Sequence, residues 1–369
     1  MLNIRSLFST ARAIVLKTAL PARPFSLHTA INTQVSSQNS SKLWKWSKHV
    51  GLGLLGTLAT ASVSSLLFHV ISTERDAKKY PPIGKFVEID GGIKMHLHIT
   101  GSGGPTVILD AGMGCNSLSW SLVQSAIDTQ VVSFDRPGNG WSDESPTDRT
   151  SQSIVTELDL ALQKANIPGP YILVGHSFGG LNMQEYARRF PHKVGGMILV
   201  DSSNPDQADK MAPPEMNHSL AMLASQLGVV RLLMHLPVYK KQVTVFPEPI
   251  QQMLLSQFRT TKFMRTVLRE TSQLKTSYES FKSAGKYLGD IPLTVISAVK
   301  TMPAKGSGYT QEQIDAFHIL FQDLQKDLVT KSTKGKQVFA TESDHMIPYH
   351  QPKIIVDSIK EMIDSLRSA

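Results

Sequence analysis

The residue best placed for chemistry in this sequence of 369 residues is Ser177, in the middle of Gly175–Gly179, which reads G-H-S-F-G. The apolar run Tyr171–Val174 before it has the length and β-branching of a buried strand, and Leu181–Phe190 after it has a helical pattern. A serine flanked by glycines between a strand and a helix predicts a sharp turn that exposes the hydroxyl as a nucleophile. The alternative is a glycine-rich turn that contains a serine by chance.

A serine nucleophile needs a base that takes its proton and a carboxylate that orients the base. The base is expected after the last strand of the sheet, and His345 stands there, shortly past Ala340. His350 is the local alternative. It directly precedes Gln351-Pro352 at the start of a helix, where a capping or rim role suits it better. We therefore predict that His345 is the general base.

The acid is harder to assign, because the loop Ala298–Gly308 after a late strand contains no Asp or Glu. An earlier predicted strand ends directly at Asp201, and from that position a carboxylate can reach His345. Asp206 is the second choice. The alternative role for Asp201 is to cap a turn. We predict Asp201 as the residue that orients the base.

Two backbone N–H groups are predicted to hold the negative oxygen of a tetrahedral intermediate. One belongs to Phe178, directly after the nucleophile, and the other to Met113, which follows Gly112 in a loop after a strand. A backbone donor leaves the side chain free, so a methionine is no obstacle. This chemistry needs no metal and no organic cofactor. The single cysteine, Cys115, gives neither an intrachain disulfide nor a metal cluster.

Strands and helices alternate after residue 85, which predicts an α/β domain with a mostly parallel, doubly wound sheet. The start differs: Phe86–Thr100 alternates in two runs around Asp90-Gly91-Gly92, so an antiparallel hairpin is expected first. The predicted strands lie at residues 106–109, 131–134, 171–174, 197–200, 293–297 and 337–340, and the predicted helices at 117–127, 151–166, 181–190, 309–329 and 352–366.

The rhythm breaks between about residues 202 and 289, where helical periodicity replaces the alternation. This stretch carries eleven Lys or Arg against six acids, a net charge of +5. We predict a helical lid inserted between two strands. Its methionines are expected mainly in ordinary core packing, with a substrate-lining role as the alternative.

The net charge of +8 comes from the N-terminal part of the chain. Residues up to Lys79 hold ten Lys or Arg and two acids, while the remainder holds 28 of each sign, so a nucleic-acid surface on the folded domain is not indicated. Residues 1–48 are basic, rich in hydroxyl groups and free of acids, as in a mitochondrial targeting segment. A disordered basic tail is the alternative.

Residues 50–71 form a run of 22 without Asp, Glu, Lys or Arg, the length of a transmembrane helix. Lysines and tryptophans just before it would sit at the membrane interface and keep the N-terminus on the positive-inside face, with the catalytic domain outside the matrix. A soluble or cleaved segment is the alternative. Residues 72–84 are expected as a linker and 85–369 as the catalytic domain.

Five pieces of the sequence stand in an order seen in one large family: Gly112-Met113-Gly114, Asp135-Arg136-Pro137-Gly138-Asn139-Gly140-Trp141-Ser142-Asp143, Val174–Gly180, Val200-Asp201-Ser202-Ser203 and Asp344-His345. From about Lys85 onward the chain resembles serine hydrolases of the α/β-hydrolase superfamily, esterases and lipases among them. The resemblance implies the α/β-hydrolase fold. It also implies that the nucleophile, the acid and the base follow one another in this order along the chain. Relatives that act on epoxides or haloalkanes use an aspartate nucleophile, which Ser177 argues against. In many relatives the acid of the catalytic triad follows the strand that corresponds to residues 293–297, and this sequence has no Asp or Glu in the loop that follows.

The function expected from these residues is hydrolysis of an acyl ester through an acyl-enzyme on Ser177. A lipophilic small-molecule substrate and a membrane are the expected partners, with a single-pass mitochondrial membrane as the location. An acyltransferase using the same residues is the first alternative. A catalytically silent binding protein on this scaffold is the second.

Overall fold

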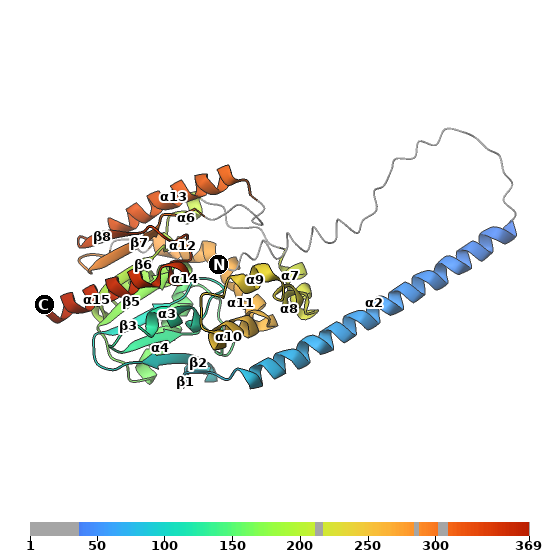
Figure 1. The fold of residues 1–369 in the computed structure, drawn as a ribbon, viewed down its shortest axis with the longest axis horizontal. Helices are drawn as coiled ribbons and strands as arrows, with labels where there is room; N and C mark the ends of the chain where they lie inside the picture. Colours follow the sequence, from blue (N-terminus) through green and yellow to red (C-terminus); the bar gives the residue numbers. More distant parts are fainter. Residues whose placement is uncertain (1–36, 211–216, 284–287, 302–308, 369) are drawn as a thin grey trace.

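The computed structural model describes residues 37–210, 217–283, 288–301 and 309–368, and an eight-stranded sheet forms its centre (Figure 1). The strand order is β1-β2-β4-β3-β5-β6-β7-β8. The strands are β1 (Lys85–Glu88), β2 (Lys94–Thr100), β3 (Thr106–Asp110), β4 (Val131–Phe134), β5 (Tyr171–His176), β6 (Val194–Val200), β7 (Leu293–Ala298) and β8 (Gly335–Ala340).

The sheet begins antiparallel and continues parallel, which confirms the predicted class. β1 pairs with β2 and β2 with β4 in antiparallel fashion, and the later pairings are parallel. The predicted hairpin turn contains Gly91 and Gly92, whose φ angles of 81° and 76° suit glycine. Because the parallel strands end at one edge, the residues just after β5, β6 and β8 are brought close together.

Helices cover both faces of the sheet, as a doubly wound sheet requires. One face carries α4 (Ser151–Lys164), α5 (Phe178–Arg189) and α13 (Gln311–Val329), and the other carries α3 (Ser121–Gln124) and α15 (Pro352–Ser368). Strand β5 shows the alternation: Leu173 packs into the first core cluster, whereas Ile172 and Val174 pack into the second.

Between β6 and β7 the chain forms the predicted helical insertion, called the lid below. Its helices pack in a cluster that also includes Leu118, which lies outside the insertion, and the Met234 and Met264 side chains are fully buried there, as expected for ordinary packing. The lid helices are α6 (Gln207–Lys210), α7 (His218–Gln226), α8 (Val229–Leu233), α9 (Pro237–Lys241), α10 (Glu248–Phe258), α11 (Thr261–Ser272) and α12 (Leu274–Ser283).

A long helix, α2 (Ser37–Lys79), precedes the sheet and extends well beyond the rest of the molecule (Figure 1). It continues through most of the expected linker. Near its end it contacts the lid: the Ser65 hydroxyl donates to the carbonyl of Leu227 at 2.5 Å, and His69 Nε2 lies 3.0 Å from Thr261 Oγ1.

Farther along the same side of α2, Arg231 of α8 holds the helix with two more contacts. Its guanidinium pairs with Asp76 at 2.6 Å and donates to Thr73 Oγ1 at 2.8 Å. Ser65, Thr73 and Asp76 are spaced to share one face of a helix. This face docks α2 on the lid.

The prediction of a transmembrane helix over residues 50–71 is not confirmed. Helix α2 covers this stretch, but no helix in the described residues is both long and apolar enough to cross a membrane. Glycine, alanine, serine and threonine dilute its leucines. The first 36 residues, where the targeting segment is predicted, lie outside the described part of the chain.

Candidate active site

Ser177 occupies a strained turn between β5 and α5, with φ 53° and ψ −121°. Its N–H donates to Val200 O at 3.1 Å, and its carbonyl accepts from Ser203 N at 2.9 Å, so the strand next to β5 holds the turn. A Cβ on Gly175 would lie 2.5 Å from Gly179 O, which explains the glycine there. Backbone strain of this kind is common where a side chain must be presented for chemistry.

His345 reaches the nucleophile from the loop after β8, and the structure brings the predicted base and Ser177 together. Its Nε2 lies 3.1 Å from Ser177 Oγ, and its Nδ1 lies 2.6 Å from Asp201 Oδ2. A carboxylate only accepts hydrogen bonds, so Nδ1 carries the proton and Nε2 presents its lone pair to the hydroxyl. This is the tautomer that a base for Ser177 needs.

Asp201 stands directly after β6, with φ 40°, and both of its carboxylate oxygens are held. Oδ1 accepts from Ala298 N at 3.0 Å, while Oδ2 faces His345. The N–H of Asp201 donates to Ile296 O at 2.7 Å, so neighbouring β7 fixes its backbone. The second choice, Asp206, lies farther on, before α6. The structure therefore brings Asp201 to the histidine.

His350, the local alternative for the base, ends the short helix α14 (Ile347–His350) and has a different partner. Its Nδ1 lies 2.8 Å from Asp344 Oδ1, and its side chain is 41% exposed. The hydrogen bond to Asp344 raises the pKa of His350. The same oxygen of Asp344 accepts from Met346 N at 3.0 Å, so this pair fastens the loop that carries His345.

The two predicted oxyanion donors lie next to the nucleophile. Phe178 opens α5, where the first N–H has no intrahelical acceptor, and a Cβ on Gly112, the neighbour of Met113, would lie 3.3 Å from Ser177 Cβ. Within the described residues, neither the Met113 N–H nor the Phe178 N–H donates a hydrogen bond to another protein group. A substrate oxygen is the acceptor expected for both.

Apolar side chains enclose this corner. Met113 and Phe178 share one buried cluster with Tyr278 and Phe281 of lid helix α12. Ser177 itself is only 3% exposed. The lid thus packs against the two residues that flank the nucleophile and carry the predicted oxyanion donors.

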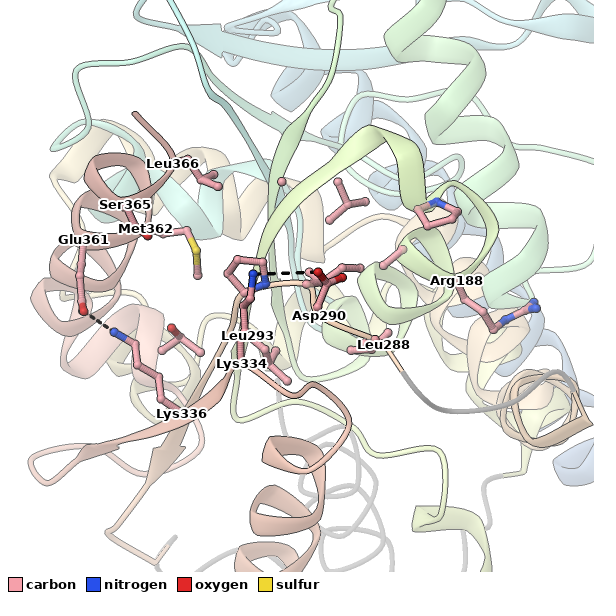
Figure 2. Close-up of a pocket in the computed structure, with 18 residues that line it drawn as sticks. Arg188, Leu288, Asp290, Leu293, Lys334, Lys336, Glu361, Met362, Ser365 and Leu366 are labelled. Atoms are coloured by element: carbon pink, nitrogen blue, oxygen red, sulfur yellow. Dashed lines mark ion pairs between the residues drawn. The ribbon is translucent and has the colours of Figure 1, made fainter. Parts of the chain in front are cut away.

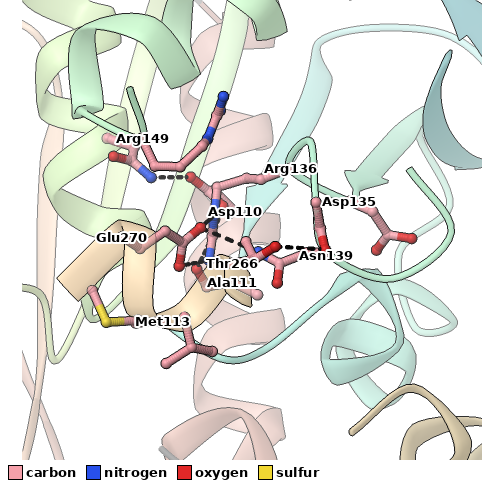
Figure 3. Close-up of polar contacts among 12 residues, drawn as sticks. Asp110, Ala111, Met113, Asp135, Arg136, Asn139, Arg149, Thr266 and Glu270 are labelled. Atoms are coloured by element: carbon pink, nitrogen blue, oxygen red, sulfur yellow. Dashed lines mark hydrogen bonds and ion pairs between the residues drawn. The ribbon is translucent and has the colours of Figure 1, made fainter. Parts of the chain in front are cut away.

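Sequence reasoning missed a buried ion cluster behind the oxyanion loop (Figure 3). Arg136 Nη1 lies 2.5 Å from Asp110 Oδ1, and Arg136 Nε lies 2.8 Å from Glu270 Oε1 on α11. Burial raises the pKa of Asp110, an effect that Arg136 opposes. Although burial disfavours its charge, Glu270 and Asp110 raise the pKa of Arg136. The sequence pointed to Arg136 only as part of a pattern, and nothing in it singled out Glu270.

His176 is the second residue missed, although it adjoins the nucleophile in sequence. Its Nε2 lies 2.8 Å from the carbonyl oxygen of His345, so the proton sits on Nε2. Burial, followed by the nearby His345, holds the pKa of His176 well below its ordinary value. A neutral His176 therefore fastens the backbone of His345.

A cavity of about 900 Å³ lies at the opposite edge of the sheet, near the starts of β6, β7 and β8 (Figure 2). Its charged groups all have partners: Lys336 pairs with Glu361, Lys334 with Asp290 at 4.0 Å, and Arg188 with Glu185 at 2.7 Å. Ligands of open α/β sheets bind at the carboxyl ends of the strands, where Ser177 lies.

Among the described residues no cluster of His, Cys, Asp and Glu could hold a metal ion.

Comparison with known proteins identifies the family of this chain. A family model described as alpha/beta hydrolase fold matches residues 105–361. The uncharacterized protein YqjL of Bacillus subtilis is 26% identical over 274 residues, which cover 73% of this chain and 88% of YqjL. The esterase Rv0045c of Mycobacterium tuberculosis is 22% identical over 273 residues, 72% of this chain and 85% of its own.

Solved structures show the same architecture. An esterase, EaEST from Exiguobacterium antarcticum, superposes with a TM-score of 0.53 at 15% identity, over 76% of this chain and 99% of that chain. At this identity the likeness concerns the fold alone.

Proposed function

The chain belongs to the alpha/beta hydrolase family, and we propose that within it the protein is a serine hydrolase that cleaves carboxylic esters through an acyl-enzyme on Ser177. The observation that carries this proposal is the unbroken hydrogen-bond path from Ser177 Oγ through His345 to Asp201. Its ends come from loops that are 168 and 144 residues from His345 in sequence. Three such groups in line constitute an activated nucleophile.

Each residue has a defined role in the proposed reaction. Ser177 Oγ attacks the ester carbonyl while His345 Nε2 takes its proton, and Asp201 stabilises the imidazolium that forms. The Met113 and Phe178 N–H groups hold the oxygen that becomes negative. His345 then protonates the departing alcohol. A water molecule, activated by His345, releases the acid and restores the serine.

A lipophilic acyl group is the substrate class that the surroundings favour. Met113 and Phe178, which carry the proposed oxyanion donors, belong to a buried apolar cluster that includes Tyr278 and Phe281 of the lid, and we propose that the acyl group lies against this side of the site. Such an apolar surface gains free energy from an alkyl chain, about 0.8 kcal/mol for each CH₂ group removed from water. We therefore expect kcat/KM to rise with acyl chain length until the site is filled.

Labelling with a fluorophosphonate probe tests the proposal directly, since the probe reacts with activated serines. Wild-type protein should be labelled and should release acid from p-nitrophenyl esters, and Ser177→Ala should do neither. A folded Ser177→Ala variant that keeps wild-type esterase activity would overturn the mechanism. Added alcohol in the same assay separates hydrolysis from acyl transfer, because a transferase would form a new ester.

The location of the protein is a separate proposal, namely a mitochondrial membrane with the catalytic domain outside the matrix. Support comes from the basic, acid-free residues 1–48. Helix α2 adds exposed apolar side chains, Val63, Leu66, Leu67 and Val70, that lipid could cover. Carbonate extraction of isolated mitochondria tests membrane association, and a protein found wholly outside mitochondria would contradict the proposal.

A further inference from the structure

We propose that Arg136 and Glu270 are positioning residues that aim the Met113 N–H into the oxyanion hole, so that lid helix α11 takes part in aligning this donor. The inference rests on the proposed serine hydrolase function. It connects the lid to the reaction through two side chains that do not themselves touch the substrate.

The guanidinium of Arg136 is fully used as a donor (Figure 3). Nη1 bonds to Asp110 Oδ1 at 2.5 Å and to the carbonyl of Ala111 at 2.6 Å, and Nη2 bonds to the carbonyl of Gly112 at 3.0 Å. Toward the lid, Nε and Nη2 bond to the two oxygens of Glu270 at 2.8 and 3.4 Å. The two-point grip of Glu270 fixes the plane of the guanidinium, and that plane fixes where both carbonyls must point.

The Gly112 carbonyl and the Met113 N–H belong to one planar peptide unit. In a trans peptide the two bonds point in opposite directions, so a carbonyl turned toward Arg136 turns the N–H away from it. Cys115 N also donates to the Gly112 carbonyl, at 3.0 Å. A carbonyl that accepts from a cation is polarised, which strengthens the N–H of the same peptide as a donor. Arg136 thus affects both the direction and the strength of the Met113 donor.

The cluster also reaches the second oxyanion donor. Asn182 of α5 donates to Asp110 Oδ2 at 2.9 Å, and α5 begins at Phe178. The Arg136 guanidinium lies 5.5 Å from the centre of the Phe178 ring. One buried cation therefore contacts the loop that carries Met113 and the helix that carries the Phe178 N–H.

Stability alone is a weak reason for this cluster. Arg136 is 2% exposed, and Asp110 and Glu270 are fully buried, so one cation and two carboxylates have lost their water. The cost of desolvating such groups often equals or exceeds what their pairing returns, and apolar replacements can be as stable. Orienting the peptide unit between Gly112 and Met113 would explain why these charged side chains are buried.

The test compares Glu270→Gln with a matched control, Glu157→Gln. Arg149 and Glu157 form another buried pair, with Nη1 and Oε1 3.0 Å apart, near the start of α4. For Glu270→Gln we expect kcat, counted per fluorophosphonate-titrated site, to fall roughly tenfold to a hundredfold, less than the loss of a whole oxyanion donor. KM should change less than about threefold, because the interaction acts in the transition state.

A trifluoromethyl ketone provides the readout that a purely structural role would not move. Its adduct with Ser177 carries a negative oxygen in the oxyanion hole, so its affinity should fall by the same factor as kcat. Glu157→Gln should lower Tm and leave both quantities near wild type. If Glu270→Gln does not fold, Glu270→Asp serves in its place, because it keeps the charge but is one CH₂ group shorter and so draws the carboxylate back from the guanidinium.

Two results separate the possible failures. Equal effects of the Glu270 and Glu157 variants on kcat and ketone affinity, or no effect of Glu270→Gln on either, would overturn the positioning role while the serine mechanism stands. Wild-type activity in Ser177→Ala would instead overturn the proposed function.

Discussion

Two histidines that follow β8, His345 in a loop and His350 at the end of α14, each pair with an aspartate, yet they differ in their other contacts. His345 has Asp201 at 2.6 Å on Nδ1 and Ser177 at 3.1 Å on Nε2, with its side chain 18% exposed. His350 has Asp344 at 2.8 Å on Nδ1 and is 41% exposed. A carboxylate at one nitrogen is common to both. The group at the other nitrogen and the degree of burial make the difference.

The order of residues along the chain does not predict which aspartate pairs with which histidine. Asp344 directly precedes His345 but bonds to His350, whereas His345 takes an aspartate from 144 residues away. Proximity along the chain is thus a poor guide to which acid orients which histidine. The parallel sheet decides, because it brings the ends of β6 and β8 to one edge.

The largest effect should come from His345→Gln. Without a base the serine keeps its proton, and losing the base of such a triad costs about 10⁵- to 10⁶-fold in kcat. His350→Gln, measured in the same esterase assay, should stay within about threefold of wild type. A severe loss in His350→Gln with activity retained in His345→Gln would reverse the comparison.

Asp201→Asn should cost about 10³- to 10⁴-fold in kcat, because an amide favours the wrong tautomer of His345. Asp206→Asn is the matched control and should change kcat less than about threefold. Steady-state kinetics of the two variants measure the difference. A mild Asp201→Asn beside a damaging Asp206→Asn would move the assignment of the acid.

His176→Phe should lower kcat by roughly fivefold. The substitution removes the hydrogen bond to the His345 carbonyl, and a bond of this kind contributes about 1 kcal/mol. The nucleophile and base remain, so end-point labelling by the fluorophosphonate should still be complete. Unchanged kcat would mean that the His345 backbone is held well enough without His176.

The smallest effect concerns pH and stability at the His350–Asp344 pair. The raised pKa of His350 means that its contribution is fully present below its ordinary value of 6.5 and is lost as pH rises through the folded pKa. In spite of burial, the bond to His350 lowers the pKa of Asp344, whose contribution is lost as pH falls through that value. The Tm difference between wild type and His350→Gln should therefore be largest between the two pKa values. A difference independent of pH would contradict this assignment.

The sequence predicted those parts of the site that lie at strand ends. Ser177 and Asp201 each follow an apolar run, and His345 follows shortly after the last one, so the pattern of strands places them at one edge. Glu270 could not be predicted in the same way. Helical periodicity shows which side of α11 is apolar, but a charged side chain is expected outside the core, and Glu270 is fully buried.

The N-terminal helix α2 shows a second limit of the sequence analysis, namely what the average composition of a stretch can predict. An uncharged stretch over residues 50–71 favoured a membrane span, since average apolarity does not distinguish the faces of a helix. In the structure one face of α2 bears Ser65, His69 and Thr73, which bond to the lid. Which face of a helix meets a partner depends on the partner, and the sequence does not show it.

The docking of α2 decides where a shortened version of this protein can begin. A polypeptide starting at Lys85 would keep the whole sheet and Ser177, and would look like a complete catalytic unit in an alignment. It would also leave the side chain of Arg231, 4% exposed in the full chain, without Asp76 and Thr73. Arg231 belongs to α8, so the lid would then contain a buried guanidinium that has lost these two partners. A polypeptide that begins before Ser65 keeps these contacts. A shortened version should therefore include the C-terminal part of α2 as well as the sheet.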